Sequence, residues 1–158
     1  MEAPLPSLLQ LLIATPLAVL LHELAHAGMA LALTRGRVLV VVGYGRGVSL
    51  TLGRLSLRVS PLAASGCCVH RGTRDRSDRA VIAAAGPIAS LMLAVFGWRL
   101  GETLAADQLF LAGLFSALGV ASAFITLLTA LPVRYPAALA VSDERDSDGL
   151  TVVRALKR

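Results

Sequence analysis

The stretch that decides the fold is Leu5–Leu33, which reads LPSLLQLLIATPLAVLLHELAHAGMALAL. As a helix its 29 residues would rise about 43 Å, which exceeds the roughly 30 Å hydrocarbon core of a bilayer. No basic residue precedes this stretch, and its apolar part is too long for a cleavable signal peptide. The sequence therefore predicts a first membrane-spanning helix over residues 5–33.

The composition of the whole chain also indicates a membrane protein. Of the 158 residues, 56% are apolar and only 16% are charged, and the mean hydropathy is +0.72. A soluble domain carries about 25% charged residues, and a disordered chain combines low hydrophobicity with high net charge. Both classes are excluded. Two further segments, residues 80–98 and 109–133, are uncharged and long enough to span.

The positions of the basic residues predict the orientation of the chain. None precedes Arg35, nine lie between Arg35 and Arg79, five lie from Arg134 to the C-terminus, and Arg99 stands alone. Basic residues beside apolar segments mark cytoplasmic loops. We therefore expect a multi-pass protein of the cell membrane, with its N-terminus outside and its C-terminus in the cytoplasm. The preference for Arg over Lys favours a bacterial plasma membrane, and the lack of aromatic residues among the arginines argues against nucleic-acid binding.

The pattern between the first two predicted spans is typical of strands. Residues 38–42 form a β-branched run, and residues 48–52 and 55–59 alternate apolar with polar side chains. Gly53 interrupts this alternation and predicts a bulge. The predicted strand region covers residues 37–60.

These elements define the fold class that we expect. It is a mainly α-helical membrane protein with three transmembrane helices and a short β-hairpin or sheet region between the first and the second. Cys67 and Cys68 fall in a predicted cytoplasmic loop. The closing segment 147–158 is too short to span and is expected to lie at the membrane interface. The chain is predicted to be one membrane-embedded unit, residues 1–158.

The first predicted span contains the sequence His22-Glu23-Leu24-Ala25-His26. Residues at i and i+4 share one face of a helix, so both imidazoles can bind one metal ion. Glu23 stands beside the first histidine, where its carboxylate can act as a general base on a water at that ion, as in zinc peptidases. Each ionisable group is costly in lipid, which favours a functional role over a chance match or polar contacts between helices.

A catalytic zinc site needs a third protein ligand besides His22 and His26. The candidates are Asp143, Glu144, Asp146, Asp148 and His70. Local chemistry favours Asp148, because Gly149 beside it permits a close backbone approach. The same acidic segment does not fit a calcium loop, since Ala155 stands where that loop needs a bidentate glutamate.

The chain resembles the site-2 protease family of intramembrane zinc metalloproteases, peptidase family M50. The matching motifs are HELAHAG at residues 22–28, Ala85-Gly86-Pro87 in the second span, and Leu131-Pro132 followed by Ser147-Asp148-Gly149 after the third. The resemblance covers nearly the whole chain and implies an endopeptidase for regulated intramembrane proteolysis. It further implies Zn²⁺ as the cofactor, His22, His26 and Asp148 as its ligands, and Glu23 as the catalytic base.

Two positions depart from the family pattern. Ser90 and Thr129 stand where the family usually carries asparagine, which bears on substrate binding or oxyanion stabilisation and not on metal binding.

The chain has room for strands but not for a PDZ or CBS domain, so it is expected to be a minimal core. The expected partners are the lipid bilayer, a membrane-protein substrate with a single-span helix, and a separate substrate-selecting or regulatory membrane protein.

Two other functions remain open at this point. A family-like protein without proteolytic activity could act as a membrane binding or regulatory subunit, and the changes at Ser90 and Thr129 would fit it. A proton or metal-ion transporter could use the same polar residues, but it would want broken helices or paired repeats, which the three predicted spans do not show.

Overall fold

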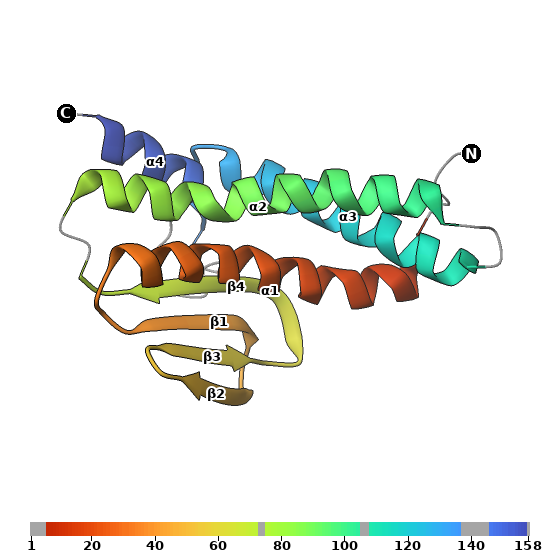
Figure 1. The fold of residues 1–158 in the computed structure, drawn as a ribbon, viewed down its shortest axis with the longest axis horizontal. Coiled ribbons are helices and arrows are strands. Elements are labelled where there is room, and N and C mark those ends of the chain that lie inside the picture. Colours follow the sequence, from red (N-terminus) through yellow and green to blue (C-terminus); the bar gives the residue numbers. More distant parts are fainter. Residues whose placement is uncertain (1–5, 73–74, 105–107, 137–145, 158) are drawn as a thin grey trace.

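Three long helices and a four-stranded sheet make up the computed structural model, which describes residues 6–72, 75–104, 108–136 and 146–157 (Figure 1). The long helices are α1 (Leu8–Leu33), α2 (Arg76–Thr103) and α3 (Leu109–Ala130). Each is long and apolar enough to cross a membrane. A shorter helix, α4 (Asp148–Leu156), lies along the first half of α2. The predicted three long helices with a small sheet are therefore present.

Helix α1 is the central element, because it lies between the sheet and the pair formed by α2 and α3 (Figure 1). It starts with a capping box, in which Gln10 N–H donates to Ser7 Oγ (3.3 Å) and Ser7 N–H donates to Gln10 Oε1 (2.7 Å). At its other end the Arg54 guanidinium donates to the carbonyl oxygens of Thr34 (2.6 Å) and Leu31 (2.8 Å). These bonds satisfy the last carbonyl groups of the helix and tie the sheet to it.

The observed helix ends differ from the predicted spans for two physical reasons. Helix α2 extends beyond residues 80–98 at both ends, because charged residues near a helix terminus still make helical hydrogen bonds. Helix α3 stops at Ala130 and not at residue 133, because Leu131 precedes Pro132 and takes an extended backbone (ψ 132°). The predicted interfacial segment 147–158 contains helix α4.

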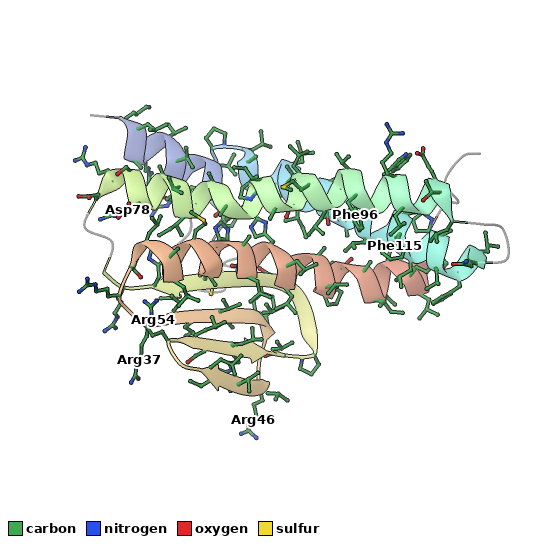
Figure 2. The ribbon with its side chains drawn as sticks, in the orientation of Figure 1. Arg37, Arg46, Arg54, Asp78, Phe96 and Phe115 are labelled. Atoms are coloured by element: carbon green, nitrogen blue, oxygen red, sulfur yellow. The ribbon has the colours of Figure 1, made fainter. Side chains whose placement is uncertain are left out.

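Helices α2 and α3 approach each other closely through glycine. A Cβ on Gly97 would lie 2.7 Å from the backbone nitrogen of Gly119 and 2.7 Å from the carbonyl oxygen of Phe115. Near this contact the rings of Phe96 and Phe115 meet edge to face at 6.5 Å (Figure 2). Small residues allow such backbone approach, which is the usual way that helices pack in lipid.

The sheet has the strand order β2-β3-β1-β4. Its strands are β1 (Val38–Tyr44), β2 (Val48–Leu52), β3 (Leu55–Val59) and β4 (Leu62–His70). Strand β1 pairs parallel with β3 and antiparallel with β4, while β2 and β3 form an antiparallel hairpin. Val38, Val40 and Val42 on β1 are fully buried and form a core cluster with residues of α1 and α2.

Two expectations for the strand region need correction. Gly53 is not a bulge: with φ +59° it begins the two-residue connection that lets Leu52 pair with Leu55. The irregularity lies instead in β1, around Gly43, which has φ +85°. The sheet also continues beyond residue 60, because β4 follows and carries the two cysteines that were expected in a loop. Strand β4 lacks the β-branched alternation that reveals a strand in sequence.

The contact between α2 and α3 predicts that Gly97→Ala destabilises the protein, because the added methyl group meets backbone atoms that cannot rotate away. The loss should be about 1–3 kcal/mol, as for other overpacked sites. Thermal unfolding in detergent would measure it as a lower Tm. Gly28→Ala is the matched control, since a Cβ on Gly28 has nothing within 4 Å. An unchanged Tm for Gly97→Ala would contradict the packing described.

Candidate metal centre

The site is built on one buried face of α1. His22 and His26 are one helical turn apart, and only 4% and 6% of their surfaces are exposed. Their Nε2 atoms lie 3.1 Å apart, and their rings are nearly perpendicular, with centroids 4.8 Å apart. The i, i+4 spacing thus directs both imidazoles to the same point, as the sequence predicts.

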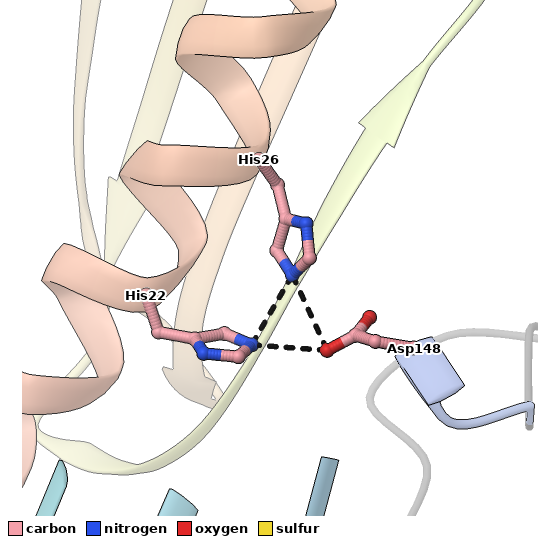
Figure 3. Close-up of side chains that lie close together, drawn as sticks. All are labelled: His22, His26 and Asp148. Atoms are coloured by element: carbon pink, nitrogen blue, oxygen red, sulfur yellow. Dashed lines mark hydrogen bonds and ion pairs between the residues drawn. The ribbon is translucent and has the colours of Figure 1, made fainter. Parts of the chain in front are cut away.

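Asp148 completes the group from the first turn of α4. Its Oδ2 atom lies 3.2 Å from Nε2 of His22 and 3.4 Å from Nε2 of His26 (Figure 3). Of the residues that the structure describes, these three form a group of possible metal ligands whose donor atoms all lie within 4.8 Å of one another. The group could hold a metal ion. A residue 122 positions after His26 in the sequence thereby becomes its neighbour in space.

A short clasp explains how Asp148 reaches the histidines from a distant part of the chain. Arg134 and Asp146 form an antiparallel bridge, and Ser147 N–H donates to the carbonyl oxygen of Val133 (3.0 Å). The Ser147 hydroxyl donates to the carbonyl oxygen of Leu131 (2.5 Å) and caps α4 by accepting from the N–H of residue 150 (3.1 Å). Ser147 is buried, so these bonds anchor the start of α4 beside the end of α3.

The outer nitrogen of each histidine has its own partner. His26 Nδ1 lies 2.6 Å from the carbonyl oxygen of Ile82, and His22 Nδ1 lies 2.9 Å from Oγ of Ser90. A carbonyl oxygen can only accept, so Nδ1 of His26 carries a proton and a neutral imidazole presents its Nε2 lone pair to Asp148. Such partners orient metal-binding imidazoles and fix their tautomers.

The three donor atoms match the size of a zinc site. In a tetrahedral site with bonds of about 2.0–2.1 Å, neighbouring ligand atoms lie roughly 3.3–3.4 Å apart. The observed separations are 3.1, 3.2 and 3.4 Å. Two imidazoles and one carboxylate also form a donor set of the kind found in catalytic zinc sites, which leave a fourth position open. Lone pairs converging at such distances require a positive charge between them, from a metal ion or an added proton.

The charge state of Asp148 fits this arrangement. Burial raises the pKa of its carboxyl, but hydrogen bonds from His22 and His26, each of which needs an added proton on Nε2, outweigh burial and lower that pKa to about 2. Asp148 is therefore a carboxylate at neutral pH, which is the form that binds a metal ion.

Glycines bring the neighbouring elements close to the ligands. A Cβ on Gly86 of α2 would lie 2.2 Å from Nε2 of His26 and 2.7 Å from Nε2 of His22. A Cβ on Gly149 would lie 2.0 Å from the carbonyl oxygen of Ala130. The expected close approach at Gly149 is thus real, but it seats α4 against the end of α3. Any larger side chain at either glycine would push the ligands apart.

Glu23, which follows His22 on α1, lies against the sheet. Only 7% of its surface is exposed, and a Cβ on Gly66 of β4 would lie 2.8 Å from its Oε1 atom. Glu23 is not a member of the group formed by the two histidines and Asp148. Glu23 therefore stands next to His22 in the helix without belonging to the group of possible ligands.

Of the other candidates for the third ligand, the two that the structure describes do not belong to this group. Asp146 forms ion pairs with Arg154 and Arg134. His70 lies at the end of β4, in register with Val38 of β1. The remaining two candidates, Asp143 and Glu144, lie outside the described residues.

Sequence reasoning missed several contacts of the site. Ser90 was identified only as a departure from the family pattern, yet its hydroxyl is the partner of His22. The carbonyl oxygen of Ile82 is the partner of His26, and a backbone group of this kind leaves no signature in the sequence. Tyr135 donates to the carbonyl oxygen of Leu128 (3.0 Å), and burial together with the charge of Asp148 raises its pKa, so its phenol stays protonated.

Comparison with known proteins returns no family model that matches the chain and no curated protein that is significantly similar to it. The resemblance to the site-2 proteases therefore rests on the motif residues alone.

The geometry predicts that metal binding depends on Asp148 and not on the nearby Asp146. We expect about one zinc ion per chain in detergent-purified protein, and its loss or weakening in His22→Ala and in Asp148→Ala. Elemental analysis after equilibration with zinc would measure this. Asp146→Asn is the control and should keep the metal. Full retention of zinc by Asp148→Ala would assign the third ligand to another residue.

The bond from Ser90 predicts a smaller effect of Ser90→Ala. Removing the hydroxyl leaves the His22 ring without its partner, and loss of such a partner lowers metal affinity about 10- to 100-fold. Competition with a chelator of known affinity would measure the change. Ser116→Ala is a suitable control, because this buried hydroxyl bonds to the carbonyl of Ala112 within α3. Equal affinities in both variants would show that Ser90 does not orient His22.

Proposed function

We propose that this protein is an intramembrane zinc metalloendopeptidase of the site-2 protease type, which hydrolyses a peptide bond within or near a transmembrane segment. The observation that carries the proposal is the convergence of His22, His26 and Asp148, with Glu23 beside them, on a helix that is long and apolar enough to cross a membrane. Two imidazoles, a carboxylate and a neighbouring glutamate are the parts of a zinc peptidase.

Apolar side chains on the outer faces of the long helices support a location in the membrane. Leu12 on α1, Met92 on α2 and Phe124 on α3 each expose 60% or more of their surface. Water would penalise so much exposed apolar area, whereas lipid accepts it. In the proposed orientation the N-terminus lies outside the cell and the C-terminus in the cytoplasm, because the basic residues cluster beside the cytoplasmic ends of the helices.

The basic residues that flank the strands fit the same orientation. Figure 2 shows Arg37 and Arg54 near the C-terminal end of α1, which is the end at which the first basic cluster begins. Arg54 bonds to the carbonyl oxygens at that helix end. Arginine placed there neutralises the negative end of the helix dipole and keeps its charge near the membrane surface.

The residues of the site would divide the work of hydrolysis. Zinc, when bound, would supply Lewis-acid chemistry that activates water and polarises the scissile carbonyl. His22, His26 and Asp148 would hold the ion, and Ser90 and Ile82 would orient the two imidazoles. The Glu23 carboxylate would take the proton from the attacking water and then deliver it to the nitrogen of the leaving amine.

Burial of these groups strengthens their action. His22, Glu23 and His26 are each less than 8% exposed, so little bulk water competes for their charges. Electrostatic interactions are stronger in such a low-dielectric setting.

The main alternative is a binding or regulatory subunit without turnover. Its support is Thr129, whose buried hydroxyl has no hydrogen-bond partner among the described residues and stands where the family usually has an amide.

The proposal predicts that Glu23→Gln abolishes cleavage and keeps the metal, because the amide cannot accept the proton and is not needed as a ligand. Cells expressing either form would be compared by labelling of new protein N-termini. We expect termini inside apolar segments with wild type that are missing with Glu23→Gln.

Glu102→Gln is the matched control, since Glu102 pairs with Arg99 at the far end of α2. Cleavage that persists in Glu23→Gln would refute the mechanism. A wild type that binds zinc but yields no new termini beyond those of Glu23→Gln would favour the regulatory subunit.

A further inference from the structure

A second site lies at the end of the molecule where α2 begins and α4 ends. A cavity of about 460 Å³ opens between these helices, within the range of about 300–1,000 Å³ that is typical of small-molecule sites. The polar residues that line it are Arg76, Arg79, Asp146, Thr151, Arg154 and Lys157. We refer to this cavity as the basic pocket. It contains none of the three proposed metal ligands.

The charges of the basic pocket are unbalanced. Among the residues that the structure describes, four cationic side chains line it, two from α2, one from α4 and one from the C-cap Lys157, and they face one carboxylate, that of Asp146. That carboxylate is already engaged by Arg154 and by Arg134, which lies outside the pocket. Like charges that converge on one cavity repel each other, so the pocket favours an anionic ligand.

The side chains of the basic pocket suit one class of anion. Arginine presents a planar fork of N–H donors that matches phosphate oxygens, and three of the four cations are arginines. The pocket lies at the end of a helix long enough to span a bilayer, which is the level of the phospholipid headgroups. Basic pockets between helices at the cytoplasmic surface are suited to anionic headgroups.

We propose that the basic pocket binds a phosphate group, either that of an anionic phospholipid or that of a soluble phosphate compound, and that this ligand holds α4 against α2. The clasp at Ser147 holds the start of α4, but none of the residues of α4, all of which the structure describes, is fully buried, so its last turn gains from such support. One polar bond that joins the two helices runs from Nη1 of Arg76 to the carbonyl oxygen of Lys157 (3.4 Å). A phosphate between Arg79 and Arg154 would add charge-assisted bonds across the same gap.

This ligand would also act on the proposed metal centre. Asp148 stands in the first turn of α4, and Arg154 stands in its last turn. Holding the last turn against α2 therefore restricts the motion of the whole nine-residue helix and keeps the Asp148 carboxylate near the histidines. Phosphate binding is then expected to strengthen metal binding. This second step rests on the proposed function, whereas binding in the basic pocket does not.

The first experiment measures the ligand alone, without metal or activity. Purified protein would be titrated with phosphatidylglycerol or phosphatidylcholine and followed by native mass spectrometry, and with inorganic phosphate in a calorimeter. We expect the double variant Arg76→Gln/Arg79→Gln to lose about tenfold or more in affinity for phosphatidylglycerol, for inorganic phosphate, or for both. Arg99→Gln, which removes one charge at the other end of α2, should bind like wild type.

The outcomes separate the two sources of phosphate. Wild type that prefers phosphatidylglycerol over phosphatidylcholine assigns the pocket to a lipid headgroup. Inorganic phosphate binding without a preference between the lipids assigns it to a soluble compound. Equal binding of every probe by wild type and the double variant overturns the proposal. If the double variant fails to fold, Arg79→Gln alone gives the same comparison, because that side chain is exposed.

The second experiment measures the link to Asp148. Cobalt(II) affinity would be followed by visible absorption with and without the phosphate probe that binds. We expect several-fold tighter cobalt binding with the probe in wild type and no change in the double variant. Unchanged affinity in wild type would overturn the link. His22→Ala should still bind the phosphate probe, so a failure of the proposed metal centre leaves the first experiment interpretable.

Discussion

The constraint on which the structure depends is the convergence of three lone pairs at one buried point. Two imidazole nitrogens and a carboxylate oxygen lie 3.1–3.4 Å apart, and such acceptors stay together only around a positive charge. The surrounding fold holds them from three sides. Helix α1 supplies both imidazoles, α2 presses on them at Gly86 and supplies their outer partners, and α4 brings the carboxylate.

Much of this organisation could be predicted from local patterns. Long apolar runs reveal the three helices, and the i, i+4 histidines reveal the face that binds. Contacts between distant segments could not be predicted in the same way. Strand β4 is rich in small residues and has no alternation, because it must lie flat against α1 where Gly66 meets Glu23. The hydroxyl of Ser90 is a partner of His22 only because α2 packs against α1. No local sequence pattern encodes that contact between helices.

The choice of Asp148 shows how local and distant reasoning combine. Local chemistry pointed to it because Gly149 permits a close approach, and the close approach exists, but its purpose differs. Gly149 lets the start of α4 pack against the backbone of Ala130, and the clasp at Ser147 then directs the carboxylate of Asp148 towards α1. The carboxylate thus depends on the end of α3 as much as on its own helix. The clasp thus brings Asp148 to the histidines although 122 positions separate it from His26.

The clasp has a consequence for how such a chain can diversify. Arg134 and Asp146 are bridged, so the two ends of the sequence between them lie side by side. The entropy of closing a loop grows only slowly with its length, by about 0.6 kcal/mol for each doubling. Sequence inserted between these two residues would therefore change the geometry of the buried centre very little. Because the bridge holds both ends together, the stretch between Arg134 and Asp146 is a place where evolution or a designer could graft a recognition module.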